Sequence, residues 1–178
     1  MQMLMNFAVF QVGWFSAVLG AAREMPWLGP AAFLVIVLFH LRQARRPDLE
    51  AGLVIACGII GTWFDSSLVA AGWVAYPSGQ LSPWVAPYWL VTMWMLFATT
   101  LNRSLGWLRG RIALAVLLGA VAGPASYWAG QKLGAIEFLD PVMATLVLSI
   151  GWAALMPILM QLAERLDGFR EVTVTETR

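Results

Sequence analysis

Long apolar runs separated by short polar connections follow one another along the whole chain. Six runs approach the ~20 apolar residues that a membrane-spanning helix needs. They are residues 3–22, 26–41, 51–72, 84–101, 112–131 and 141–163. Residues 31–39 are apolar on every face, whereas a strand of a membrane β-barrel alternates in polarity. Because lipid offers the backbone no hydrogen-bond partners, we predict that the six runs are transmembrane helices.

This pattern predicts an all-α fold, a polytopic transmembrane helical bundle. Residues 1–163 are expected to form one transmembrane domain, and residues 164–178 a charged cytoplasmic tail. The second run, 26–41, is short, so it either tilts little or forms a partly re-entrant segment. No basic residue precedes the first run, which is unlike a cleavable signal peptide, so we interpret that run as a retained span.

The basic residues gather on one side of the predicted bundle. Only Arg23 and Lys132 fall on the other side. The remaining nine of the eleven Lys and Arg residues are Arg42, Arg45, Arg46, Arg103, Arg109, Arg111, Arg165, Arg170 and Arg178. Cytoplasmic connections carry an excess of Lys and Arg. Both termini are therefore predicted to lie in the cytoplasm.

Composition agrees with a membrane location. Hydrophobic residues make up 60% of the chain and charged residues 12%, about half the charged fraction of a soluble domain. The net charge of +1 gives no indication of nucleic-acid binding. One histidine, His40, and one cysteine, Cys57, cannot build a metal site unaided. No phosphate loop, nucleophile elbow or dinucleotide fingerprint is present, so neither a metal nor a cofactor is expected.

Asp65 is the polar residue of the predicted spans that most needs an explanation. It lies in the third span, where an ionised carboxylate costs roughly 3 kcal/mol on insertion scales. Gly58 and Gly61 share its helix face and allow another helix to approach closely, so Asp65 is expected to face the bundle interior. Two interpretations stay open: a proton relay, substrate anchor or acid–base group, or a link between helices, for example to Arg23.

Polar residues of the first span extend this candidate site. Gln11 and Trp14 fall on one helix face. A buried amide must be hydrogen-bonded, so Gln11 is expected to face protein, either as a structural link or as a ligand contact. Arg23 and Glu24 end the span. They form either an ordinary interfacial pair or the rim of an outward cavity that binds a headgroup.

Ten tryptophans are unusual for this length. Those near the outer ends of spans are typical of an interfacial aromatic belt, although an aromatic-lined pocket is the alternative. Trp14, Trp63 and Trp94 lie deeper and fit the pocket better, although they serve equally well as core-filling residues. Tyr127 follows Pro124, which should kink the fifth span and free backbone carbonyls. The candidate ligand-binding residues are Asp65, Gln11, Trp14, Arg23, Glu24, Trp63 and Tyr127.

Several segments together resemble a known family. They are residues 6–15 and 18–22, Asp65, residues 94–101 with Ser104, Trp107 and Leu108, and residues 119–135 with Gly123, Pro124 and Tyr127. Over nearly the whole chain the sequence resembles domain-of-unknown-function family 2878, a bacterial inner-membrane family. The resemblance implies a small inner-membrane protein whose relatives are encoded near lipid-modifying and flavin-dependent enzymes. It implies a link to membrane lipids or oxidative stress and assigns no catalytic residue.

The leading hypothesis is a protein that binds or handles a membrane lipid, or another apolar ligand, in an intramembrane pocket near Asp65. A small proton-coupled transporter, with Asp65 titrating, is one alternative. Another is a non-catalytic membrane subunit that docks a lipid-modifying enzyme at the cytoplasmic face. Membrane lipids are the expected partners, and the small-residue stripes would also suit a homodimer.

Overall fold

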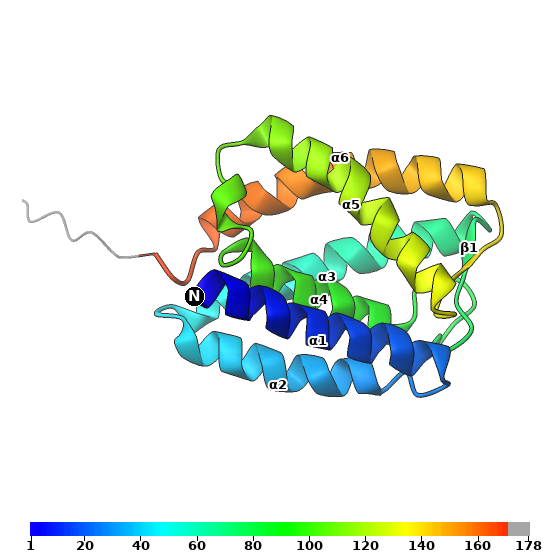
Figure 1. Ribbon diagram of the computed structural model, residues 1–178, viewed down its shortest axis with the longest axis horizontal. Coiled ribbons are helices and arrows are strands. Elements are labelled where there is room, and N and C mark those ends of the chain that lie inside the picture. The colour runs from blue at the N-terminus through cyan, green and yellow to red at the C-terminus, as the bar shows by residue number, and fades with distance from the viewer. Residues whose placement is uncertain (171–178) are drawn as a thin grey trace, which may run out of the picture.

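The computed structural model describes residues 1–170 and consists almost entirely of helices (Figure 1). Within these residues, the α-helices are α1 (Gln2–Ala22), α2 (Leu28–Gln43), α3 (Pro47–Ala70), α4 (Tyr88–Leu101), α5 (Ile112–Lys132) and α6 (Pro141–Arg165). Between them lie strand β1 (Val74–Ala75), the 3-10 helix η1 (Gly106–Leu108) and strand β2 (Glu137–Phe138). The predicted all-α fold with six helices is confirmed.

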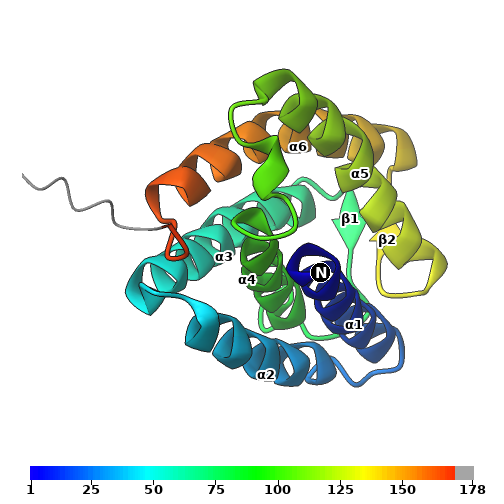
Figure 2. The ribbon, with the colours of Figure 1, turned by 60° about the vertical axis from the view of Figure 1, so that its left-hand side comes forward.

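Helix α4 lies at the centre of one half of the bundle, with α1, α2 and α3 packed around it (Figure 2). Helices α5 and α6 pack along each other as a hairpin, and α6 contacts α3 and α4. Two glycines of α5 permit the close approach within the hairpin, because a Cβ at Gly119 or Gly123 would overlap Trp152 of α6. Small residues at this spacing favour helix association in lipid.

Three connections meet at one end of the bundle, called here the basic end. They are residues 44–46, 102–111 and 166–170. The backbone N–H of Arg46 donates to Gly168 O at 3.0 Å, and Arg103 donates to Gln2 near the N-terminus at 3.2 Å. At the opposite end, β1 pairs antiparallel with β2. The N-terminus and residue 170 therefore lie at the same end of the bundle.

Four helices, α1, α3, α5 and α6, are long and apolar enough to cross a membrane. Helices α2 and α4 are apolar but shorter, at 16 and 14 residues. The chain is thus built as a multi-pass membrane protein, in which each helix satisfies its own backbone.

Helix α4 is short because the chain before it turns into the bundle. The indole N–H of Trp89 donates to Ser78 O at 3.1 Å, and Ser78 Oγ donates to Ala21 O at 2.7 Å. Pro87 caps α4 in an extended conformation with ψ of 148°. The predicted start of this span at Trp84 is therefore wrong by four residues, and Trp84 lies in the connection.

The chain after α6 folds back onto the basic end. Helix α6 continues to Arg165, and the following residues Asp167 and Gly168 are buried. Asp167 forms an ion pair with Arg109 at 2.7 Å. Residues 166–169, expected to belong to a cytoplasmic tail, are thus packed against the bundle. The rest of that predicted tail, 171–178, lies outside the described residues.

Candidate functional site

Three helices converge on the carboxylate of Asp65, which is 0% exposed. Its Oδ2 accepts the indole N–H of Trp94 from α4 at 2.5 Å, and its Oδ1 accepts the hydroxyl of Tyr127 from α5 at 2.6 Å. Gly61, one helical turn before Asp65, lets the Trp94 ring lie against α3, because a Cβ there would overlap that ring. The prediction that Asp65 faces the bundle interior is confirmed.

Within the described residues, no cation pairs with Asp65. Arg23, considered from the sequence as its partner, is exposed in the turn after α1, beside the equally exposed Glu24. Glu24 adopts a left-handed backbone conformation with φ of 58°. The two neutral donors, an indole and a phenol, satisfy the carboxylate where an ion pair was the expected alternative.

A second phenol, Tyr76, lies near this carboxylate in the connection before α4. It is 5% exposed, and its hydroxyl has no hydrogen-bond partner in the part of the chain that the structure describes. Burial, and after it the charge of the Asp65 carboxylate, raises the pKa of the Tyr76 phenol well above its ordinary value. Tyr76 therefore stays a neutral phenol at physiological pH.

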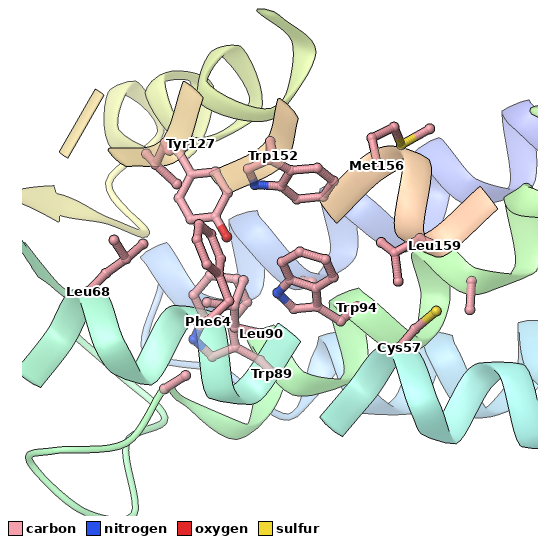
Figure 3. Packing of buried hydrophobic residues seen from close by; sticks show 14 of the residues in the cluster. Cys57, Phe64, Leu68, Trp89, Leu90, Trp94, Tyr127, Trp152, Met156 and Leu159 are labelled. Carbon is pink, nitrogen blue, oxygen red and sulfur yellow. The ribbon is translucent and has the colours of Figure 1, made fainter. Parts of the chain in front are cut away.

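A cavity of about 520 Å³ lies beside this cluster, between α1 on one side and α4, α5 and α6 on the other. Trp94 and Tyr127, both held by Asp65, form part of its wall, whereas Asp65 itself does not. Figure 3 shows the rings of Trp94 and Trp152 beside Tyr127. These two indoles stack with centroids 4.6 Å apart and an interplanar angle of 12°. The rest of the wall is mainly aromatic and aliphatic.

The structure brings three of the candidate ligand-binding residues to this cavity. Gln11, Trp14 and Tyr127 line it, and Asp65 lies behind Tyr127 and Trp94. Arg23 and Glu24 are not part of the wall. Trp63 is 74% exposed on the outer surface of α3, so it also lies apart from the cavity.

Besides Gln2, helix α1 carries two amides, Asn6 and Gln11, whose surroundings are opposite. Asn6 Nδ2 donates to Thr99 O at 3.1 Å, and Asn6 Oδ1 accepts the backbone N–H of Ser104 at 3.2 Å. Gln11, half-buried in the cavity wall, has no hydrogen-bond partner among residues 1–170. Of the two interpretations of Gln11, the structural link therefore has no hydrogen bond to support it, because the side chain lines the cavity.

Trp152 is the main residue of the cavity that sequence reasoning missed. It lies in the middle of α6, where an isolated tryptophan carries no polar signal of its own. A signal did exist on another helix. The small pair Gly119 and Gly123 indicates that something large packs against α5, and in the structure that group is Trp152.

A second buried polar cluster, also missed, lies at the basic end. Glu50 is 0% exposed, and its Oε2 lies 2.8 Å from His40 Nε2. Its Oε1 accepts from Asn102 Nδ2 at 2.7 Å and from the backbone N–H of Gly168 at 2.9 Å. The sequence places these four residues far apart, so only the packing of helix ends brings them together. The cluster joins α2, α3, α4 and the segment after α6.

Residues 1–170 contain no candidate metal site: no group of three or more His, Cys, Asp or Glu side chains there is arranged to hold a metal ion. Cys57 is a free, buried thiol in the middle of α3.

Comparison with known proteins identifies a family but no characterised relative. Neither a curated protein nor a solved structure matches the chain significantly. Residues 3–158 match DUF2878, a family described as a protein of unknown function. This match covers all of the residues that surround Asp65 and line the cavity, and it confirms the resemblance found in the sequence. The chain belongs to the DUF2878 family.

Proposed function

We propose that this protein binds the apolar part of a membrane lipid, or another apolar ligand, in the cavity between α1 and the α4–α5–α6 wall. The observation that carries the proposal is the cavity itself. Its volume of about 520 Å³ lies in the range of ligand sites, and its wall is apolar with few polar groups, as such sites usually are.

The rim of the cavity favours entry of the ligand from the side. Phe7 and Phe15 of α1 line the cavity and are 50% and 48% exposed, and Ala122 on the α5 side is also exposed. In a membrane, these residues lie against acyl chains rather than water. An apolar ligand then passes between α1 and α5 without leaving the hydrocarbon region, which avoids the cost of exposing it to water.

In this proposal, Asp65 is a positioning residue. It does not line the cavity, but its two oxygens fix the Trp94 indole and the Tyr127 phenol, which do. The proposed ligand contacts are Gln11, Trp14 and these two aromatic residues. Ligand contacts are not proposed for Arg23, Glu24 and Trp63, because they do not line the cavity.

The orientation follows from charge. Eight of the nine Arg residues assigned above to one side fall within the described part, at or next to the basic end. From the positive-inside rule we propose that the basic end faces the cytoplasm, with both termini inside. The proposed location in the bacterial inner membrane rests on the family resemblance. The opposite end, with β1 and β2, faces outward.

Filling the cavity tests the proposal. Ala122→Phe places a ring in the cavity, whereas Val121→Phe places the same ring on the neighbouring outward position, which is 62% exposed. Lipid retained by each protein after purification in detergent is quantified by mass spectrometry. We expect one lipid class to be enriched in wild type and in Val121→Phe and to be lost in Ala122→Phe. Equal bulk lipid in all three proteins would overturn the proposal.

Proton-coupled transport is a second candidate, because Asp65 is a buried carboxylate with no cation beside it among residues 1–170. Intramembrane acids of this kind often mark proton pathways. Asp65→Asn in proteoliposomes distinguishes the two functions. Transport predicts that a pH gradient drives proton flux in wild type and none in the variant. Ligand binding alone predicts no flux in either protein.

A further inference from the structure

The Gln11 amide is a polar group that the protein leaves unsatisfied. Its neighbour on α1, Asn6, uses both ends of its amide within the bundle. Gln11 faces the cavity with no protein partner among the described residues. An amide in a water-poor environment is costly without a hydrogen bond. A plain hydrocarbon ligand has no hydrogen-bond acceptor, so the Gln11 amide would still lack a partner when that ligand is bound.

Gln11 lies about halfway along α1. Asn6 contacts Thr99 across the antiparallel helices α1 and α4. Gln11 lies about 7.5 Å farther along α1 at 1.5 Å per residue. The same rise along α4 leads from Thr99 back to Trp94, whose ring stacks on Trp152. Gln11 therefore faces the level of the stacked indoles, in the middle of the helices.

We infer that the ligand carries a carbonyl oxygen at mid-membrane depth, which accepts a hydrogen bond from the Gln11 Nε2 group while its apolar arms fill the aromatic cavity. The inference rests on the proposed binding function and names the ligand class. Two classes of membrane ligand carry such a carbonyl, acyl esters and quinones. Both present the same acceptor to the amide.

A matched pair of probes isolates the carbonyl. Detergent-purified protein is incubated with an equimolar mixture of heptadecane and heptadecan-9-one, repurified, and the retained ratio is measured by gas chromatography and mass spectrometry. The two chains differ only in the central oxygen. We expect wild type to retain the ketone in about tenfold excess, the size of one net hydrogen bond. Methyl hexadecanoate and decylbenzoquinone, run the same way, distinguish the two sources.

Two variants test whether Gln11 sets this preference. Gln11→Leu and the nearly isosteric Gln11→Met remove the amide and keep an apolar, helix-forming side chain. Both should retain the two chains equally while still binding them. Ser16→Ala is the control, because Ser16 is also on α1 but its hydroxyl donates to Val12 O at 2.7 Å and does not line the cavity.

The outcomes separate this inference from the proposed function. Equal retention of ketone and alkane by wild type, or an unchanged preference in both Gln11 variants, would overturn the inference and leave the binding function standing. Retention of neither probe would overturn both. If wild type is a dimer that Gln11→Met converts to a monomer, the amide serves a contact between copies, and the inference is wrong.

Discussion

Asp65 of α3 and Trp94 of α4 are joined by a hydrogen bond of 2.5 Å, and the same indole stacks on Trp152 of α6. Asp65 does not line the cavity, but it fixes the Trp94 ring in the cavity wall. The Trp94 ring in turn packs against the ring of Trp152. Substitutions at Asp65 are expected to act on the cavity through Trp94 and Tyr127, and not through a lost ligand contact.

Asp65→Asn should destabilise the fold. The substitution replaces one acceptor oxygen by an amide N–H₂ group, which then faces either the Trp94 N–H or the Tyr127 hydroxyl. A buried donor left without an acceptor costs about 1–3 kcal/mol. We expect a free energy of unfolding lower by that amount, measured by denaturant titration in mixed micelles. Trp63→Phe, on an indole 74% exposed, is the control and should change it by less than about 0.5 kcal/mol. Equal stability of the two variants would contradict the assignment.

Gly123→Ala should loosen the α5–α6 hairpin. A Cβ at Gly123 meets the Trp152 side chain well inside van der Waals contact, so the tryptophan and its stacked partner Trp94 must shift. Overpacking of this kind costs about 1–3 kcal/mol. Unfolding in mixed micelles measures the loss, and near-ultraviolet circular dichroism reports the disturbed indole pair.

Gly52→Ala is the matched control for that substitution. Gly52 is also within a helix, α3, but the nearest heavy atom to a Cβ there is Leu166 Cδ1 at 4.0 Å. Alanine favours the helix by about 1 kcal/mol over glycine, so this variant should be as stable as wild type or more so. A similar loss for both glycines would show that close packing on Trp152 is not the cause.

The sequence predicts the helices well because the length of each apolar run is close to the length of the helix that it forms. All six predicted spans match helices α1 to α6 with bounds that differ by at most four residues at either end. The largest differences, four residues each, are at the starts of α3 and α4, and the start of α4 depends on Ser78 reaching Ala21, a contact between residues far apart in the chain. Nothing in the local pattern around Trp84 reveals that contact.

The candidate site can be predicted only in part from the sequence. Small residues around Asp65 predict that it faces inward, and it does. Its partners Trp94 and Tyr127 come from helices whose rotation about their axes is fixed by packing, which one sequence does not disclose. For the same reason the sequence leaves open whether Gln11 links helices or contacts a ligand, and Glu50 and His40 were not expected to meet.

Glu50→Gln should weaken the basic end. Glu50 contacts His40, Asn102 and the Gly168 N–H, and its burial leaves no water to replace a lost acceptor. Hydrogen bonds to a charged group contribute about 1.5–3 kcal/mol each, so we expect a loss of roughly that size in unfolding free energy. Hydrogen exchange should also show faster exchange of the Gly168 amide.

Asp48→Asn provides the comparison. It removes an acidic charge only two residues away, but Asp48 and its partner Arg46 are 61% and 53% exposed. Exposed ion pairs contribute little to stability, because water and salt screen the two charges. A small effect on stability and none on Gly168 exchange is therefore expected. If Asp48→Asn were as damaging as Glu50→Gln, burial would not be what makes Glu50 important.

The orientation of the bundle can be read with single cysteines. Cys57 is buried, so Cys57→Ala gives a background without thiols. In that background, Leu81→Cys places a thiol in the connection before α4, where Leu81 is 86% exposed, and Asp48→Cys places one at the basic end. Because the basic end is proposed to face the cytoplasm, a membrane-impermeant maleimide should label only Leu81→Cys in spheroplasts, and both after lysis. Labelling of Asp48→Cys alone before lysis would reverse the orientation, and labelling of both would mean that α3, the helix between the two sites, does not cross.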